Sequence, residues 1–148
     1  MAAVQLALYK GKGRIGNALI RAWTGSPYSH CELVVNGVAY SSSIRDGGVR
    51  AKPIEFDSQN WDFIDLPEEF GPRVRAYYGI TVGQRYGWLD LLTGQVFNRA
   101  KDDPSAAFCS EWCAAALGLP NATIFSPRTL GDLVRALLSP PWRQQRSV

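Results

Sequence analysis

The dipeptide Asn36-Gly37 lies between two short runs of residues that have the composition of β-strands. The runs are His30–Val35 and Val38–Ser43, which are rich in β-branched, aromatic and small side chains. Both central residues of a two-residue type I′ turn need a positive φ angle, which asparagine and glycine adopt more readily than other residues. The pattern therefore predicts a tight β-hairpin and, with it, an antiparallel sheet.

Around this hairpin the chain carries further strand signals and then mostly helix signals. Val4–Tyr9 and Trp61–Leu66 have the apolar content and bounds of two more strands. Apolar spacing and capping residues predict helices at Ile15–Trp23, from Pro67-Glu68-Glu69 onward, at Tyr86–Phe97, at Cys109–Leu117 before Gly118, and after Ser126-Pro127. Together these elements predict an α+β fold, with a small antiparallel sheet packed against helices.

The length of 148 residues suits one domain, 1–148, whose residues 140–148 we expect to form a flexible tail. Hydrophobic residues make up 46% of the chain and charged residues 20%, which fits a globular protein and argues against disorder. No run approaches the roughly 18 apolar residues of a membrane span, and the first residues lack a secretory signal, so we expect a cytoplasmic protein as synthesised. The net charge of +3 is spread along the chain, which argues against a nucleic-acid partner.

The residues suited to nucleophilic chemistry are few, because the chain has three cysteines and one histidine. An odd number of cysteines without a secretory signal argues against a disulfide framework. No Cys-x-x-Cys pair occurs, so we expect neither a metal site nor another cofactor. A thiol that works with the single imidazole is the remaining possibility.

Cys109 is the candidate nucleophile, since it lies where an irregular segment gives way to a predicted helix. Unpaired N–H groups in a first helical turn favour a thiolate and can hold an oxyanion. A helix capped at Asp103-Pro104 is an alternative that would put Cys109 in the second turn. His30 opens a predicted strand, and imidazole is the usual group that accepts a thiol proton. Core packing is the structural alternative for both residues, and it is our interpretation of Cys113.

Three stretches of the chain resemble one enzyme family in their order and spacing. The first runs from Gly13 through Trp23-Thr-Gly-Ser-Pro-Tyr-Ser-His30, the second is Tyr86-Gly-Trp-Leu-Asp-Leu-Leu92, and the third is Phe125-Ser-Pro-Arg-Thr-Leu130. Together with a Cys-Ser-Glu at Cys109, they resemble the circularly permuted branch of the NlpC-type papain-like cysteine hydrolases. The resemblance runs from about Gly13 to Leu130 and implies a permuted papain-like fold.

The resemblance also implies a role for each site residue. Cys109 would be the nucleophile, and His30 would be its general base and later general acid. A third polar residue that orients the imidazole commonly lies on the strand after the hairpin, often as glutamate. Serines occupy that strand here, so Ser41 is the best-aligned third catalytic residue, with Ser42 and Glu32 as alternatives. Glu32 shares a strand face with His30, two residues away.

Function follows from the same resemblance. It implies a thiol hydrolase that cleaves an amide through an acyl-enzyme, with the peptide stem of peptidoglycan as the family-typical substrate. Carriage in a phage tail, beside other virion proteins, is one route to the cell wall. The alternatives are a lipid acyl hydrolase or acyltransferase of the same fold, and a structural virion or assembly module with a weakened site. Near the proposed site, Arg45, Asp46 and Arg50 are either readers of a charged substrate or a solvated loop.

Overall fold

A computed structural model describes residues 3–11, 27–43, 46–82 and 104–139, with the side chains of the last range described from Cys109 onward. Its centre is a five-stranded sheet in which every neighbouring pair is antiparallel. The strand order across the sheet is β4-β3-β2-β1-β5. The strands are β1 (Val4–Tyr9), β2 (His30–Val35), β3 (Val38–Ser43), β4 (Gly48–Pro53) and β5 (Trp61–Leu66). The predicted α+β class and antiparallel sheet are confirmed.

The predicted hairpin joins β2 to β3. Asn36 and Gly37 have φ angles of 50° and 80°, as the two central residues of a type I′ turn require. The sequence patterns did not predict the strand β4, which pairs with β3 and begins at Gly48; Gly47 and Gly48 both have a positive φ angle. β4 carries two cations and ends in a proline, which is typical of an edge strand that must not pair with another chain. Because this strand has few apolar residues, the alternation of apolar and polar residues that predicts a strand is weak in it.

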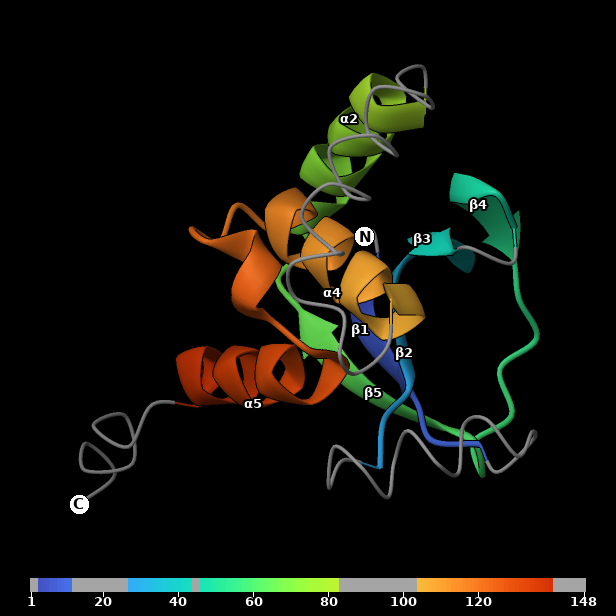
Figure 1. Cartoon of the computed structure of the whole chain (residues 1–148), viewed down its shortest axis with the longest axis vertical. Helices are drawn as coiled ribbons and strands as arrows, with labels where there is room; N and C mark the ends of the chain where they lie inside the picture. The colour runs from blue at the N-terminus through green and yellow to red at the C-terminus, as the bar shows by residue number, and fades with distance from the viewer. Residues whose placement is uncertain (1–2, 12–26, 44–45, 83–103, 140–148) are drawn as a thin grey trace.

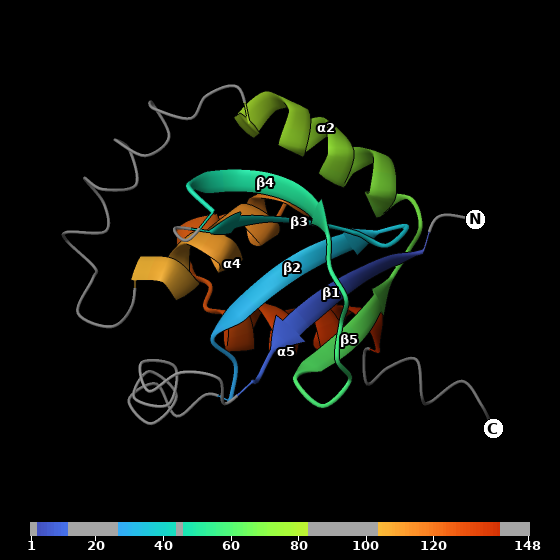
Figure 2. The ribbon, with the colours of Figure 1, turned by 90° about the vertical axis from the view of Figure 1, so that its right-hand side faces the viewer.

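The helices pack on one face of the sheet and along its β4 edge (Figures 1 and 2). α4 (Pro104–Ala116) packs on β2 and β3, α5 (Pro127–Leu138) packs on β1 and β5, and α2 (Phe70–Val82) lies beside β4. A short 3-10 helix, Ala122–Ile124, leads from α4 to α5. The buried side chains between sheet and helices include Val4, Leu6, Leu8, Cys31, Leu33, Val35, Val74, Cys109, Trp112, Cys113, Leu130 and Val134. None of the helices within the described ranges is long and apolar enough to cross a membrane.

The opposite face of the sheet has a smaller apolar cluster. Ala7, Val34 and Ala39 are buried there against partly buried side chains of the segment between β4 and β5. That segment crosses in front of β2 and β1 in Figure 2. It contributes Ile54 and Phe56, and Phe56 packs edge-on against Trp61 at 4.9 Å between ring centroids. The two faces of β2 therefore lie in different environments, one under the helices and the other under a loop.

Two helix boundaries differ from the expected ones. α4 begins at Pro104, five residues before the expected start at Cys109, so the helix start at Asp103-Pro104 that we gave as the alternative holds. α2 begins at Phe70, after a turn in which the Phe70 N–H donates to the Pro67 carbonyl. The expected helices Ile15–Trp23 and Tyr86–Phe97 and the expected tail 140–148 lie outside the described residues.

The start of α5 offers a test of local capping. The Ser126 hydroxyl accepts a hydrogen bond from the Thr129 N–H, and the Thr129 hydroxyl accepts one from the Ser126 N–H, at 3.2 Å and 2.8 Å. Loss of such a cap costs about 1 kcal/mol. We expect Ser126→Ala to lower the free energy of unfolding by about that amount in a urea titration. Ser58→Ala, at an exposed turn position, is the matched control and should have no measurable effect; equal losses in the two variants would contradict the capping role.

Candidate functional site

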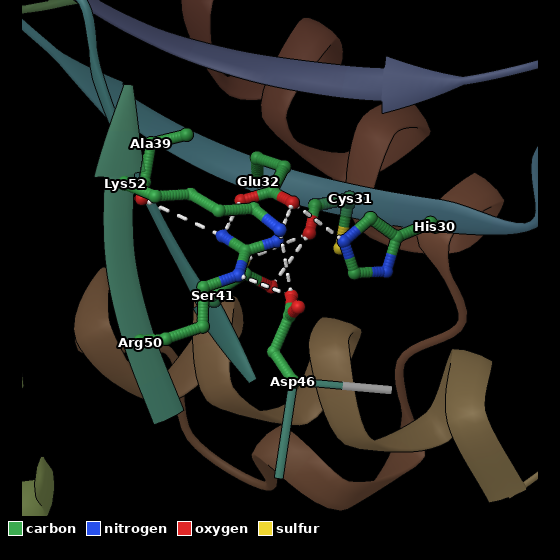
Figure 3. A network of polar contacts seen from close by, with 9 residues as sticks. His30, Cys31, Glu32, Ala39, Ser41, Asp46, Arg50 and Lys52 are labelled. Carbon is green, nitrogen blue, oxygen red and sulfur yellow. Dashed lines mark hydrogen bonds and ion pairs between the residues drawn. The ribbon is translucent and has the colours of Figure 1, made fainter. Parts of the chain in front are cut away.

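The site begins at the first residues of β2. Side chains alternate along a strand, so His30 and Glu32 project to one face while Cys31 projects to the helix-covered face. The Nε2 atom of His30 lies 2.7 Å from Oε1 of Glu32 (Figure 3). The His30 side chain is 23% exposed, whereas the Glu32 side chain is 1% exposed. A partly exposed imidazole is thus held from behind by a buried carboxylate.

α4 brings Cys109 to the same end of β2. The helix packs across β2 and β3, and Cys109 lies in the core against Cys31. Both the His30 ring and the Cys31 thiol are within hydrogen-bonding reach of the Cys109 sulfur. The fold therefore unites the cysteine and the histidine that the sequence singled out, although they come from opposite halves of the chain.

The surroundings of Cys109 favour its thiolate. Burial alone raises the pKa of this thiol, because an apolar environment disfavours the charged form. Hydrogen bonds from the thiol and the backbone N–H of Cys31, together with the charge and hydrogen bond of protonated His30, lower the pKa further than burial raises it. The net pKa falls from 9.0 to about 5. Cys109 lies in the second turn of α4. The expectation that free N–H groups of a first helical turn stabilise its thiolate is therefore wrong.

The imidazole of His30 shifts in the opposite direction. Burial lowers the pKa of His30, whereas the negative charge and hydrogen bond of Cys109, followed by those of Glu32, raise it from 6.5 to about 10. At neutral pH the two groups therefore form a thiolate–imidazolium pair, like that of cysteine nucleophiles activated by a histidine. In such a pair the sulfur carries the negative charge that nucleophilic attack requires.

The imidazole is oriented by Glu32, which was one of the two alternatives to Ser41. Burial raises the pKa of Glu32, but hydrogen bonds from Arg50 and His30 leave it lowered overall, so the side chain is a carboxylate. The Ser41 hydroxyl instead donates to the Cys31 carbonyl, at 2.8 Å. Ser42, the other alternative, is buried on β3. Ser41 is thus hydrogen-bonded to the backbone carbonyl of the residue after His30, whereas Glu32 contacts the His30 ring itself.

The cations near the turn have partners within the protein. Arg50 binds both carboxylate oxygens of Glu32 and also Asp46, whose other cationic partner is Lys52 at 2.9 Å (Figure 3). Arg50 is therefore engaged by two carboxylates, which argues against a role as a reader of a charged substrate, and its 14% exposure on β4 argues against the alternative of a solvated loop. Arg45, the third residue of that expectation, lies outside the described residues. This ion-pair chain was not predicted, because it depends on the register of β4.

Access to the sulfur is restricted. Cys109 has no exposed surface, and neither have Cys31 and Cys113. Cys113 packs in the core as expected, with its Sγ 3.9 Å from the Cys31 carbonyl oxygen. The partly exposed His30 side chain, by contrast, faces solvent. Among the described residues, no group of three or more acidic, histidine or cysteine side chains could hold a metal ion.

Comparisons with known proteins add little to this geometry. No family model matches the chain, and no solved structure matches it. A curated protein, the nonribosomal peptide synthetase easA of Emericella nidulans, is 31% identical over 101 residues, which is 67% of this chain and 1% of that protein. The chain thus spans about 1% of the length of that relative. A match of this extent does not show that this chain shares the activity of the synthetase.

Proposed function

We propose that the chain is a thiol hydrolase that cleaves an amide bond through an acyl-enzyme, on a permuted papain-like fold of the NlpC type. The observation that carries the proposal is the contact chain from Cys109 through His30 to Glu32. Perturbed pKa values that arise from specific charged partners are a feature of catalytic sites. The α+β architecture with a helix-borne cysteine and a strand-borne histidine is compatible with that fold.

The roles follow from the geometry. The Cys109 thiolate attacks the carbonyl carbon, and the carbon–nitrogen bond breaks as His30 gives its proton to the leaving amine. His30, now neutral, then accepts a proton from water, whose oxygen attacks the thioester; the acid is released, and the Cys109 thiolate and the His30 imidazolium are restored. Because Glu32 contacts Nε2, we assign the other ring nitrogen, Nδ1, to the sulfur and the leaving group. Glu32 stabilises the imidazolium and is the third residue of this mechanism, in place of Ser41.

The substrate class rests on the family resemblance. We propose the peptide stem of peptidoglycan, with carriage in a phage tail as the route to the wall. The complete burial of Cys109 favours a second candidate, a structural module of a virion or other assembly in which the site is inactive. A lipid acyl hydrolase or acyltransferase would use the same nucleophile on an ester.

Mass spectrometry of purified muropeptides separates these candidates. We expect wild-type protein to convert a peptide stem into two fragments whose masses sum to the substrate plus one water. Cys109→Ala should abolish the products, whereas Cys113→Ala, at an equally buried position of the same helix, should retain them. The same proteins are assayed with long-chain acyl esters and thioesters. Turnover of esters alone would replace the peptidase by the lipid enzyme, and no turnover of either class would support the structural module.

A further inference from the structure

The guanidinium of Arg50 lies on the carboxylate that holds His30. Its NH1 atom lies 2.5 Å from Oε2 of Glu32, and its NH2 atom bonds to Oε1 of the same carboxylate. Its Nε atom donates to Asp46 at 2.8 Å, and NH1 also approaches the Ala39 carbonyl, at 3.5 Å. The Arg50 side chain is 14% exposed, so this fork is largely removed from water.

Local structure explains how β4 delivers this side chain. β3 and β4 pair in a register that sets Arg50 opposite Ser41, on the same side of the sheet as Ala39 and Glu32. Asp46, which precedes β4, accepts a hydrogen bond from Nε of Arg50. The two terminal nitrogens of Arg50 are therefore available to donate to Glu32. Each hydrogen-bonding edge of the guanidinium thus has a carboxylate partner, which suits its planar geometry.

The oxygen that contacts His30 is shared with Arg50. Oε1 of Glu32 is within hydrogen-bonding distance of both His30 Nε2 and Arg50 NH2, while Oε2 accepts a hydrogen bond from Arg50 NH1. Two parallel bonds from a rigid fork fix the plane of a carboxylate, which a single contact leaves free to rotate. The direction in which Oε1 points at the imidazole is therefore set by a residue that does not itself reach the ring.

We propose that Arg50 is a positioning residue of the site, which acts through Glu32 to hold the His30 ring against Cys109. This inference rests on the proposed thiol hydrolase and extends it to a residue in no direct contact with the reacting atoms. The ionised groups form a chain of alternating sign: Cys109, His30, Glu32, Arg50, Asp46 and Lys52.

Charge alternation explains why the arginine is needed. A carboxylate buried as deeply as Glu32 is costly when unpaired, and it takes up a proton or turns away when its cation is removed. Either event would remove the acceptor from Nε2 of His30. Lysine would retain the positive charge of Arg50 but could not form the two parallel bonds, so the charge and the fork can be separated by substitution.

The test uses the single histidine of the chain, whose ring gives one unambiguous set of nitrogen signals in long-range ¹H–¹⁵N NMR. The pKa of His30 and the kinetic constants on muropeptides are measured for wild type, Arg50→Lys, Arg50→Met and Lys52→Met. The lysine variant keeps the proposal testable if the methionine variant does not fold. Lys52→Met is the matched control, because Lys52 is 44% exposed and contacts Asp46 rather than Glu32.

We expect the pKa of His30 to fall by about one unit or more in Arg50→Lys, because a Glu32 carboxylate that the fork no longer holds turns away from the ring, and His30 then loses its close opposite charge. The value of kcat should fall with KM unchanged, and Lys52→Met should match wild type in both measurements. An unchanged or higher pKa of His30 in a folded Arg50→Lys variant would overturn the inference. A wild-type protein with a raised pKa of His30 that falls in Arg50→Lys, but with no hydrolysis, would support the inference while refuting the proposed function.

Discussion

Replacing His30 with glutamine should move the ionisation midpoint of Cys109 from about 5 to the ordinary thiol range, near 8.5 or above. The imidazolium supplies both a charge and a hydrogen bond to the thiolate, and glutamine supplies no charge. Burial, which raises the pKa of the thiol, would then be opposed only by Cys31. At pH 7 the thiolate fraction would drop from nearly complete to about 3%, a loss of about 30-fold.

The sign of the pH dependence follows from the two shifts. The pKa of Cys109 is lowered to about 5, so the thiolate is present above that pH and is lost as the pH falls through it. The pKa of His30 is raised to about 10, so the imidazolium is present below that pH and is lost as the pH rises through it. Hydrolysis by the wild type should therefore be bell-shaped in pH, with limbs near 5 and 10. His30→Gln lacks the general acid and base, so its hydrolysis should be lost, and only the ionisation of Cys109 can be followed in that variant.

Thiolate absorbance near 240 nm measures this ionisation without a reagent that must reach the buried sulfur. Subtracting the titration of Cys109→Ala isolates the contribution of Cys109 from those of Cys31 and Cys113. Cys113→Ala should retain the low-pH step, since Cys113 does not contribute to the lowered pKa of Cys109. A wild-type step near pH 8.5 would mean that Cys109 is an ordinary thiol and would remove the basis for the proposed hydrolase.

Much of the fold could be predicted because its signals are local. Asn36-Gly37 specifies a turn by the backbone angles of two residues, and Ser126-Pro127 specifies the start of α5 by a capping side chain and a first-turn proline. β4 was missed because an edge strand is identified by its neighbour rather than by its own residues. The start of α4 stayed open because proline at the first helical position and the small-residue run at Cys109 offered two competing boundaries.

The site was predictable only in part, and for a similar reason. Cys109 and His30 can be chosen by residue type, and strand alternation makes Glu32 a candidate for contact with His30. Arg50 reaches Glu32 only because β3 and β4 pair in one particular register, which spacing along the chain does not contain. The burial of Cys109 is likewise a property of how α4 packs on the sheet. Function-bearing contacts that depend on tertiary packing are therefore the ones that sequence patterns miss.

Truncation of Trp112 to alanine should be among the most destabilising single changes, at about 3–5 kcal/mol of unfolding free energy. Trp112 lies three residues after Cys109 on α4 and is fully buried between that helix and α2. Its indole N–H donates to the Thr81 hydroxyl at 3.1 Å, and its ring lies 5.5 Å from that of Tyr77. Removing it would leave a large cavity where the two helices meet, and the loss is a large share of the 5–15 kcal/mol of a typical domain.

Denaturant unfolding of two further variants separates volume from hydrogen bonding. Trp112→Phe keeps an aromatic ring but loses part of the indole volume and the bond to Thr81, whose own hydroxyl still donates to the Tyr77 carbonyl at 2.9 Å, so we expect a smaller loss than in Trp112→Ala. Trp61→Ala, on the loop-covered face and partly exposed, should cost less than Trp112→Ala. Equal losses for the two alanine variants would show that the α2–α4 contact is not a main source of stability.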